Sequence, residues 1–163
     1  MSEIEKFWKI VRVDDFEVRS EGLDEWSEFE RKNPKHFENM KNRFTKIFYK
    51  TYSGKVLHDF NVLDIEIKCN TMPARKSEIR ILIYDVYEDY GKDVYFYLVY
   101  RDVQAYAINI PRPNLETPWY LDIFEEIDED TLKHRISLTG NGYIEITFKT
   151  ISMIRVKKED INI

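Results

Sequence analysis

The sequence predicts a single α+β domain, with N-terminal helices packed on a mainly antiparallel sheet of five to seven strands. Apolar residues recur at three- and four-residue steps before Gly54 and alternate with polar residues after it. Helical and extended segments are thus grouped rather than interleaved, which favours α+β over a parallel α/β fold. The turn residues Gly140-Asn141-Gly142 join two alternating segments, as in a β-hairpin. We expect one domain over residues 1–163, mainly helical over 1–56 and mainly sheet over 57–163.

The clearest predicted helix begins at Asn33-Pro34 and ends near Gly54. Asn33 is suited to cap the free amides, and Pro34 fits the first turn because its missing N–H is not needed there. The predicted apolar face of this helix consists of Phe37, Met40, Phe44, Ile47 and Phe48. A second helix over residues 23–32 is predicted from a shorter apolar stripe at Leu23, Trp26 and Phe29. Residues 7–13 fit a helix and a strand equally, because short apolar runs do not separate the two.

Strands are expected where apolar and polar residues alternate between turn residues. The predicted strands are residues 62–69, 78–86, 94–101, 105–110, 119–124, 132–138 and 143–150. The segment 94–101 is apolar on both faces and is therefore predicted to be central in the sheet. Prolines at positions 111, 113 and 118 predict a long loop, because proline cannot donate to a strand ladder.

The charge balance limits the classes of partner. The chain has 25 basic and 30 acidic residues and a net charge of −5, which opposes general attraction to a phosphate backbone. We therefore expect no nucleic-acid partner, and a basic protein is the favoured partner. A mild excess of acidic residues is, however, also ordinary in soluble domains and needs no partner to explain it. The single cysteine, Cys69, predicts a reducing compartment. With no signal-peptide pattern and no long apolar run, the expected location is cytoplasmic, without membrane insertion.

One acidic run stands out as a candidate partner-binding surface. It holds five carboxylates in six positions, namely Glu125, Glu126, Asp128, Glu129 and Asp130. A calcium loop needs spaced oxygen ligands and a glycine at its sharp turn, and this run has neither. The ordinary interpretation is a solvated loop. If the run binds a partner, a basic protein surface fits best, because clustered carboxylates speed the encounter with such a surface.

Three histidines are present, and two of them form the alternative candidate ligand site with an aspartate: His58, Asp59 and His134. A zinc or iron site built from these residues lacks the close spacing of known metal motifs, so we expect no metal. His58 with Asp59 is also a candidate general base with its orienting carboxylate. Adjacent residues on an extended chain point apart, however, so a structural role is favoured in which Asp59 caps a turn and His58 packs beneath the helix. His134 is predicted to share the inward face of its strand with Leu132 and Ile136.

No sequence motif for nucleophilic, phosphate or dinucleotide chemistry is present, so neither a catalytic residue nor a cofactor is predicted. Cys69 alternates in phase with Ile65 and Ile67, which indicates a small buried side chain rather than a nucleophile. Tyrosines are dense between positions 84 and 106, but the segment lacks the basic, glycine-containing motif of an RNA-binding sheet. Core packing and a protein-binding face explain them better, because tyrosine buries its ring while keeping its hydroxyl in water.

Several short motifs resemble a group of uncharacterised bacterial proteins of unknown function, over roughly Arg43 to Phe148. They are Arg43-Phe44-Thr45-Lys46, Leu57-His58-Asp59, His134-Arg135-Ile136-Ser137-Leu138 and Tyr143-Ile144-Glu145-Ile146-Thr147-Phe148. The resemblance implies a cytosolic bacterial domain, similar in style to the small immunity proteins that neutralise polymorphic toxins. Two functions thus remain: a non-enzymatic, immunity-like binding protein, and a small enzyme or ligand-binding domain with its site near His58, Asp59 and His134.

Overall fold

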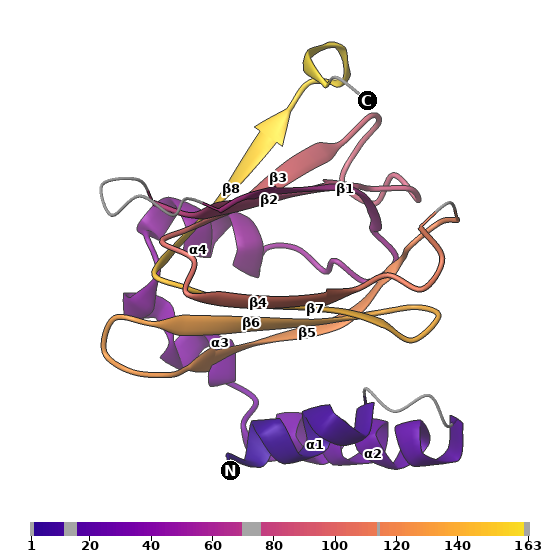
Figure 1. The fold of residues 1–163 in the computed structure, drawn as a ribbon, viewed down its shortest axis with the longest axis vertical. Helices are drawn as coiled ribbons and strands as arrows, with labels where there is room; N and C mark the ends of the chain where they lie inside the picture. The colour runs from indigo at the N-terminus through magenta and orange to yellow at the C-terminus, as the bar shows by residue number, and fades with distance from the viewer. Residues whose placement is uncertain (1, 12–15, 70–75, 114, 162–163) are drawn as a thin grey trace.

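A computed structural model describes residues 2–11, 16–69, 76–113 and 115–161. In these residues the chain forms four α-helices and eight strands, and the strands make two antiparallel four-stranded sheets stacked on each other (Figure 1). The α+β class and the antiparallel pairing are therefore confirmed. The prediction of one sheet with five to seven strands was wrong in detail, because the strands divide between two layers.

Sheet A has the order β1-β2-β3-β8, and sheet B the order β4-β7-β6-β5. The strands of sheet A are β1 (Asn61–Lys68), β2 (Glu78–Tyr84), β3 (Tyr95–Arg101) and β8 (Thr150–Val156). The strands of sheet B are β4 (Ala105–Asn109), β5 (Trp119–Glu126), β6 (Leu132–Leu138) and β7 (Gly142–Phe148). As predicted, β3 is central and β6 is joined to β7 by the glycine hairpin, where Gly140 and Asn141 both have positive φ.

The chain passes from one sheet to the other at two neighbouring points. After β3, Asp102 takes a φ of 55° and the chain turns into β4. After β7, Lys149 alone separates the last strand of sheet B from β8 of sheet A. The two crossings are held together because the Lys149 amide donates to the Arg101 carbonyl at 3.1 Å and the Gln104 amide to the Thr147 carbonyl at 2.8 Å.

The main core fills the space between the two sheets. Its fully buried side chains alternate along the strands, so that one face of each sheet points inward. Sheet A contributes Ile79, Ile81, Ile83, Leu98 and Tyr100, and sheet B contributes Ile136, Leu138, Ile144, Ile146 and Phe148. The rings of Tyr100 and Phe148 meet across the layers, with centroids 5.1 Å apart. This core fixes the inner face of sheet B, which carries the candidate site.

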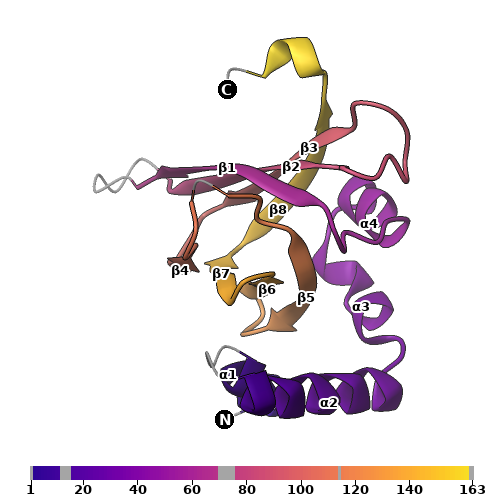
Figure 2. The same ribbon diagram turned by 90° about the vertical axis from the view of Figure 1, so that its right-hand side faces the viewer.

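An N-terminal helical hairpin, α1 (Glu3–Val11) and α2 (Phe16–Lys32), covers the opposite face of sheet B (Figure 2). It builds a second, smaller core with β5 from Ile4, Phe7, Trp8, Trp26, Phe29 and Ile123. The ambiguous N-terminal segment is thus helical up to residue 11, while residues 12–13 and the side chain of Leu23 lie outside the described residues. Beneath the hairpin, buried Arg135 donates to Glu125 at 2.9 Å and to Glu145 at 2.9 Å.

The predicted long helix over residues 33–54 is broken into α3 (His36–Asn39), the 3₁₀ turn η1 (Lys41–Arg43) and α4 (Lys46–Ser53). The break occurs because Phe44 is extended and the Thr45 side chain accepts a hydrogen bond from the Phe48 amide, which starts a new helix. The new register leaves Ile47 79% exposed, so its predicted place on the buried face was wrong. The helix ends at Gly54, as expected.

Two further expectations about side chains fail for local reasons. Cys69 was predicted to be buried, but it is exposed just beyond the end of edge strand β1, with its Sγ 3.8 Å from the Tyr106 hydroxyl. His58 was predicted to pack beneath the helix, but its side chain is 49% exposed.

No helix among the described residues is both long enough and apolar enough to cross a bilayer.

Candidate functional site

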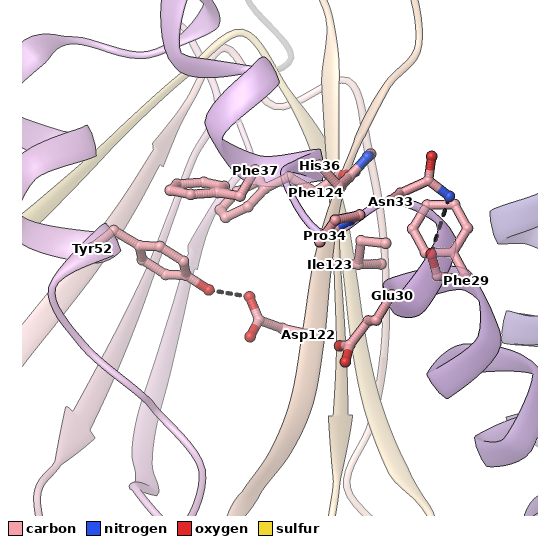
Figure 3. A pocket seen from close by; sticks show the side chains of 10 residues that line it. All are labelled: Phe29, Glu30, Asn33, Pro34, His36, Phe37, Tyr52, Asp122, Ile123 and Phe124. Atoms are coloured by element: carbon pink, nitrogen blue, oxygen red, sulfur yellow. Dashed lines mark hydrogen bonds between the residues drawn. The ribbon is translucent and has the colours of Figure 1, made fainter.

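A pocket of about 370 Å³ lies where α2 and α3 approach the outer edge of sheet B (Figure 3). Because β5 is an edge strand, residues from both of its faces reach this pocket. Its lining is aromatic, with two carboxylates, and consists of Phe29, Glu30, Asn33, Pro34, His36, Phe37, Tyr52, Asp122, Ile123 and Phe124. His36 closes one side, since its Nε2 lies 2.7 Å from the Phe124 carbonyl oxygen.

Asp122 is the polar centre of the pocket. Its Oδ2 accepts a short hydrogen bond from the Tyr52 hydroxyl and lies 2.6 Å from His134 Nε2. Its Oδ1 accepts from the Trp119 indole N–H at 3.2 Å. The side chain nevertheless keeps 19% of its surface exposed. Three donors therefore fix the carboxylate in place while part of it stays open to the pocket.

His134 lies behind Asp122 and is fully buried, as its predicted inward position requires. Its ring stacks on Phe124, with centroids 3.9 Å apart and planes 9° from parallel, and its Nδ1 lies 2.6 Å from the Tyr100 hydroxyl. A carboxylate only accepts hydrogen bonds, so Nε2 carries a proton toward Asp122. We assign Nδ1 as the acceptor of the Tyr100 hydroxyl, which makes the imidazole neutral.

The two tyrosines of this network are held in their protonated form. Burial, and next the charge of Asp122, raises the pKa of the Tyr52 hydroxyl well above its ordinary value. The same two causes, in the same order, raise the pKa of Tyr100. Both hydroxyls therefore remain donors at neutral pH, and all of the donors around Asp122 are neutral groups. The negative charge of Asp122 is stabilised by these hydrogen bonds but is not cancelled.

The walls of the pocket suit a cation. Figure 3 shows Asp122 between Tyr52 of α4 and Glu30 of α2, with the rings of Phe29, Phe37 and Phe124 around them. Glu30 is held by a short hydrogen bond from the Trp26 indole. Aromatic faces attract ammonium and guanidinium groups, and a carboxylate that is partly shielded from water attracts them more strongly than an exposed one. The partly exposed carboxylate of Asp122 and the exposed Glu30 therefore give the pocket a negative lining that suits a cationic group.

The alternative ligand residues His58, Asp59 and His134 do not form one site. His58 is on the surface, where its Nδ1 lies 2.8 Å from the Tyr120 carbonyl oxygen, whereas His134 is buried on Asp122. His58 Nε2 lies 3.5 Å from Asp59 Oδ1, contrary to our expectation for adjacent residues. The two side chains meet because Asp59 has a φ of 70° and the chain is not extended there.

The acidic run is divided by the structure. Glu125 is buried and accepts from Arg135 and from the Ser2 hydroxyl, so it faces the interior. The other four carboxylates, Glu126, Asp128, Glu129 and Asp130, are exposed at the end of the β5–β6 hairpin. Arg43 anchors this loop by donating to Glu126 at 3.0 Å and to the Asp128 carbonyl. A hydrogen bond from the Asp130 amide, followed by contacts with Thr131 and Arg43, holds the pKa of Asp128 below its ordinary value.

Sequence reasoning identified His134 but missed Asp122, Tyr52, Tyr100 and Glu30. The signal for Asp122 was present: it is the one acidic residue within Trp119–Phe124, in phase with the inward-facing Phe124. Tyr52 gave no such signal, because its partner lies 70 positions away in the sequence.

Among the described residues, no group of three His, Cys, Asp or Glu side chains is arranged to hold a metal ion.

Comparison with models of known protein families finds none that matches the chain. Curated proteins likewise give no significant match. No solved structure matches significantly either. The function must therefore be argued from the geometry of the pocket and of the surface around it.

Proposed function

We propose that this chain is a non-enzymatic protein-binding domain, similar in role to small bacterial immunity proteins, that binds a basic partner and takes one of its cationic side chains into the pocket. The observation that carries the proposal is Asp122, a partly exposed carboxylate in an aromatic pocket that, among the described residues, has no lysine or arginine partner. An arginine or lysine side chain placed there gains a charge partner and ring contacts at once. Glu30 supplies a second carboxylate on the opposite wall.

The exposed acidic loop supports the same kind of partner. It begins two residues after Phe124, the last pocket residue of β5, so a basic surface that reaches the pocket also approaches the loop. The four exposed carboxylates would mainly accelerate association, whereas the buried cation would contribute to the lifetime of the complex. Arg43 keeps the loop in position by bonding its backbone as well as Glu126.

Binding is favoured over catalysis because the imidazole of the His134–Asp122 pair is not accessible from the pocket. His134 is fully buried behind Asp122 and has both ring nitrogens occupied, so a substrate in the pocket does not reach the imidazole. His58 is exposed, but its ring bonds a backbone carbonyl away from His134. The three residues of the enzymatic alternative therefore do not form one site, because His58 and Asp59 meet on the surface while His134 is buried elsewhere.

The pocket is tested by titrating the protein with N-acetyl-arginine amide and N-acetyl-lysine amide, with the norleucine amide as a neutral control. Binding of the cations, followed by amide NMR shifts in Tyr52 and Phe124, is expected. Asp122→Asn should weaken it roughly tenfold to a hundredfold, because a hydrogen bond to a charged group contributes about 1.5–3 kcal/mol. Asp89→Asn, at an exposed position between β2 and β3, is the matched control and should have no effect.

The loop is tested with the partner captured from the source cell. Changing its four exposed carboxylates to amides should slow association, more at low ionic strength than at high, with little change in dissociation. The matched control neutralises the same number of exposed carboxylates elsewhere, namely Asp64, Glu66, Asp89 and Glu116. Equal on-rates for the two variants would remove the loop from the interface. Turnover of a small molecule that is lost in His58→Ala would replace the proposal with the enzymatic one.

A further inference from the structure

A second surface, on the helical side of the molecule, has the opposite charge. Of the 25 basic and 30 acidic residues in the chain, residues 33–57 contain six basic and only one acidic, so this segment is net positive in a net negative protein. It comprises α3, η1 and α4. The pocket beside Asp122 does not use these basic residues, so their concentration needs a separate explanation.

Three of these lysines surround a groove of about 630 Å³ formed by η1 and α4. Lys41, Lys46 and Lys50 line it together with the rings of Phe44 and Tyr49. All three lysines are exposed, and in the described part of the chain none of them is in an ion pair. Neighbouring Arg43 does pair, with Glu126 at 3.0 Å, so carboxylates are close by but bind the arginine instead.

The floor of the groove is aromatic and fixed. Tyr49 stacks on Phe37, with ring centroids 5.3 Å apart and planes 11° from parallel, and Lys41 Nζ lies 5.4 Å from the Tyr49 ring centre. Beside Lys46 on the same helix, Ile47 is the most exposed of the large apolar side chains in the described residues. The surface thus joins three lysines that have no ion-pair partner among the described residues to apolar area that water covers in the free protein.

We infer that this groove binds an acidic segment of a partner protein that also carries apolar side chains. The carboxylates of such a segment would pair with Lys41, Lys46 and Lys50, while an apolar side chain would lie against Tyr49 in the groove or against Ile47 beside it. A long polyanion such as nucleic acid fits less well, because the rest of the chain is acidic and repels it. A small phosphate would use the lysines but leave the apolar area unused.

The test is fluorescence anisotropy of a short labelled peptide of alternating glutamate and leucine, with two comparison probes: a glutamate peptide without leucine and inorganic phosphate as competitor. Binding of the first peptide is expected to be tighter than that of the second and insensitive to millimolar phosphate. Lys46→Glu with Lys50→Glu should weaken it about tenfold or more, since each exposed ion pair contributes a factor of roughly two to five and reversal adds repulsion. Raising the salt concentration should also weaken binding of the glutamate–leucine peptide to the unchanged protein.

The control is Lys9→Glu with Lys32→Glu, which makes the same charge change at exposed lysines on α1 and α2. This control should bind the peptide as the unchanged protein does. Equal weakening in the two double variants would show a general charge effect and overturn the inference. Displacement by phosphate, or equal affinity for the two glutamate peptides, would also overturn it in favour of a simple anion site. Circular dichroism of each variant checks that the overall helix content is unchanged.

Discussion

Replacing Asp122 by alanine should destabilise the protein strongly, because three donors share this one acceptor. The substitution leaves the Tyr52 hydroxyl, the Trp119 indole N–H and the His134 Nε2–H without their partner, two of them in fully buried side chains. A buried donor left unsatisfied costs about 1–3 kcal/mol, and neighbouring losses are not additive, so we expect a total near 3–6 kcal/mol. A domain of this size has a stability of about 5–15 kcal/mol, so the loss is a large fraction of it.

Urea unfolding followed by tryptophan fluorescence measures this loss, with Trp119 in the network and Trp8 and Trp26 in the second core as reporters. The melting temperature should fall by about 6–24 °C, since 1 kcal/mol corresponds to roughly 2–4 °C in a chain of this length. Asp122→Asn should cost only about 1–2 kcal/mol, because the amide keeps one oxygen as an acceptor. Asp89→Ala, in an exposed loop, is the control and should change stability by less than about 0.5 kcal/mol. A loss in Asp122→Ala no larger than the control would refute the proposed network.

Three further predictions test other parts of the structure. Tyr52 and Tyr100 have raised pKa values in the folded protein, so they contribute stability that is fully present below the unfolded pKa of about 10. This stability is lost as the pH rises through the folded pKa values. Urea midpoints should therefore fall at alkaline pH, and they should fall less steeply in Tyr52→Phe. Phe44→Ala should cost about 3 kcal/mol because its ring packs on three others, whereas Ile47→Ala on the solvent side should cost almost nothing. Equal melting temperatures of the two variants would show that Phe44 is not on the buried face of this segment. Arg135→Met should cost about 3–5 kcal/mol, measured by urea unfolding, because it removes the buried cation that pairs with Glu125 and Glu145. An unchanged urea midpoint would show that this ion pair does not contribute to stability.

The division into helices and strands was predictable because it depends on local periodicity. The central place of β3 followed from its two apolar faces, and the β6–β7 hairpin followed from Gly140 and Asn141, which accept positive φ. The break in the predicted long helix was harder to find. Thr45 is an ordinary residue in a helical pattern, and only its hydrogen bond to the Phe48 amide shows that it caps a new helix.

The two-layer arrangement was not predictable from the same patterns. Periodicity indicates that a segment is a strand but does not identify the strands it pairs with. Strand β8 was not among the predicted strands: it follows β7 after the single residue Lys149, and the predicted strand over residues 143–150 ended at its first residue. The two strands nevertheless belong to different sheets. The site shows the same limit: His134 was correctly placed inward, but its partner Asp122 depends on the register of β5 with β6.

The two proposed binding surfaces share one structural support. The Phe37 ring contacts Tyr52, which lines the pocket with Asp122, at 5.2 Å, and Tyr49, which lines the lysine groove, at 5.3 Å. Tyr52 and Tyr49 are on the same helix, three positions apart, so α4 presents one tyrosine to each site. The Phe37 ring of α3 therefore supports both the acidic pocket and the basic groove. Substitutions in either charge set should affect one site alone, whereas loss of the Phe37 ring should loosen both, because each site uses a tyrosine packed against it.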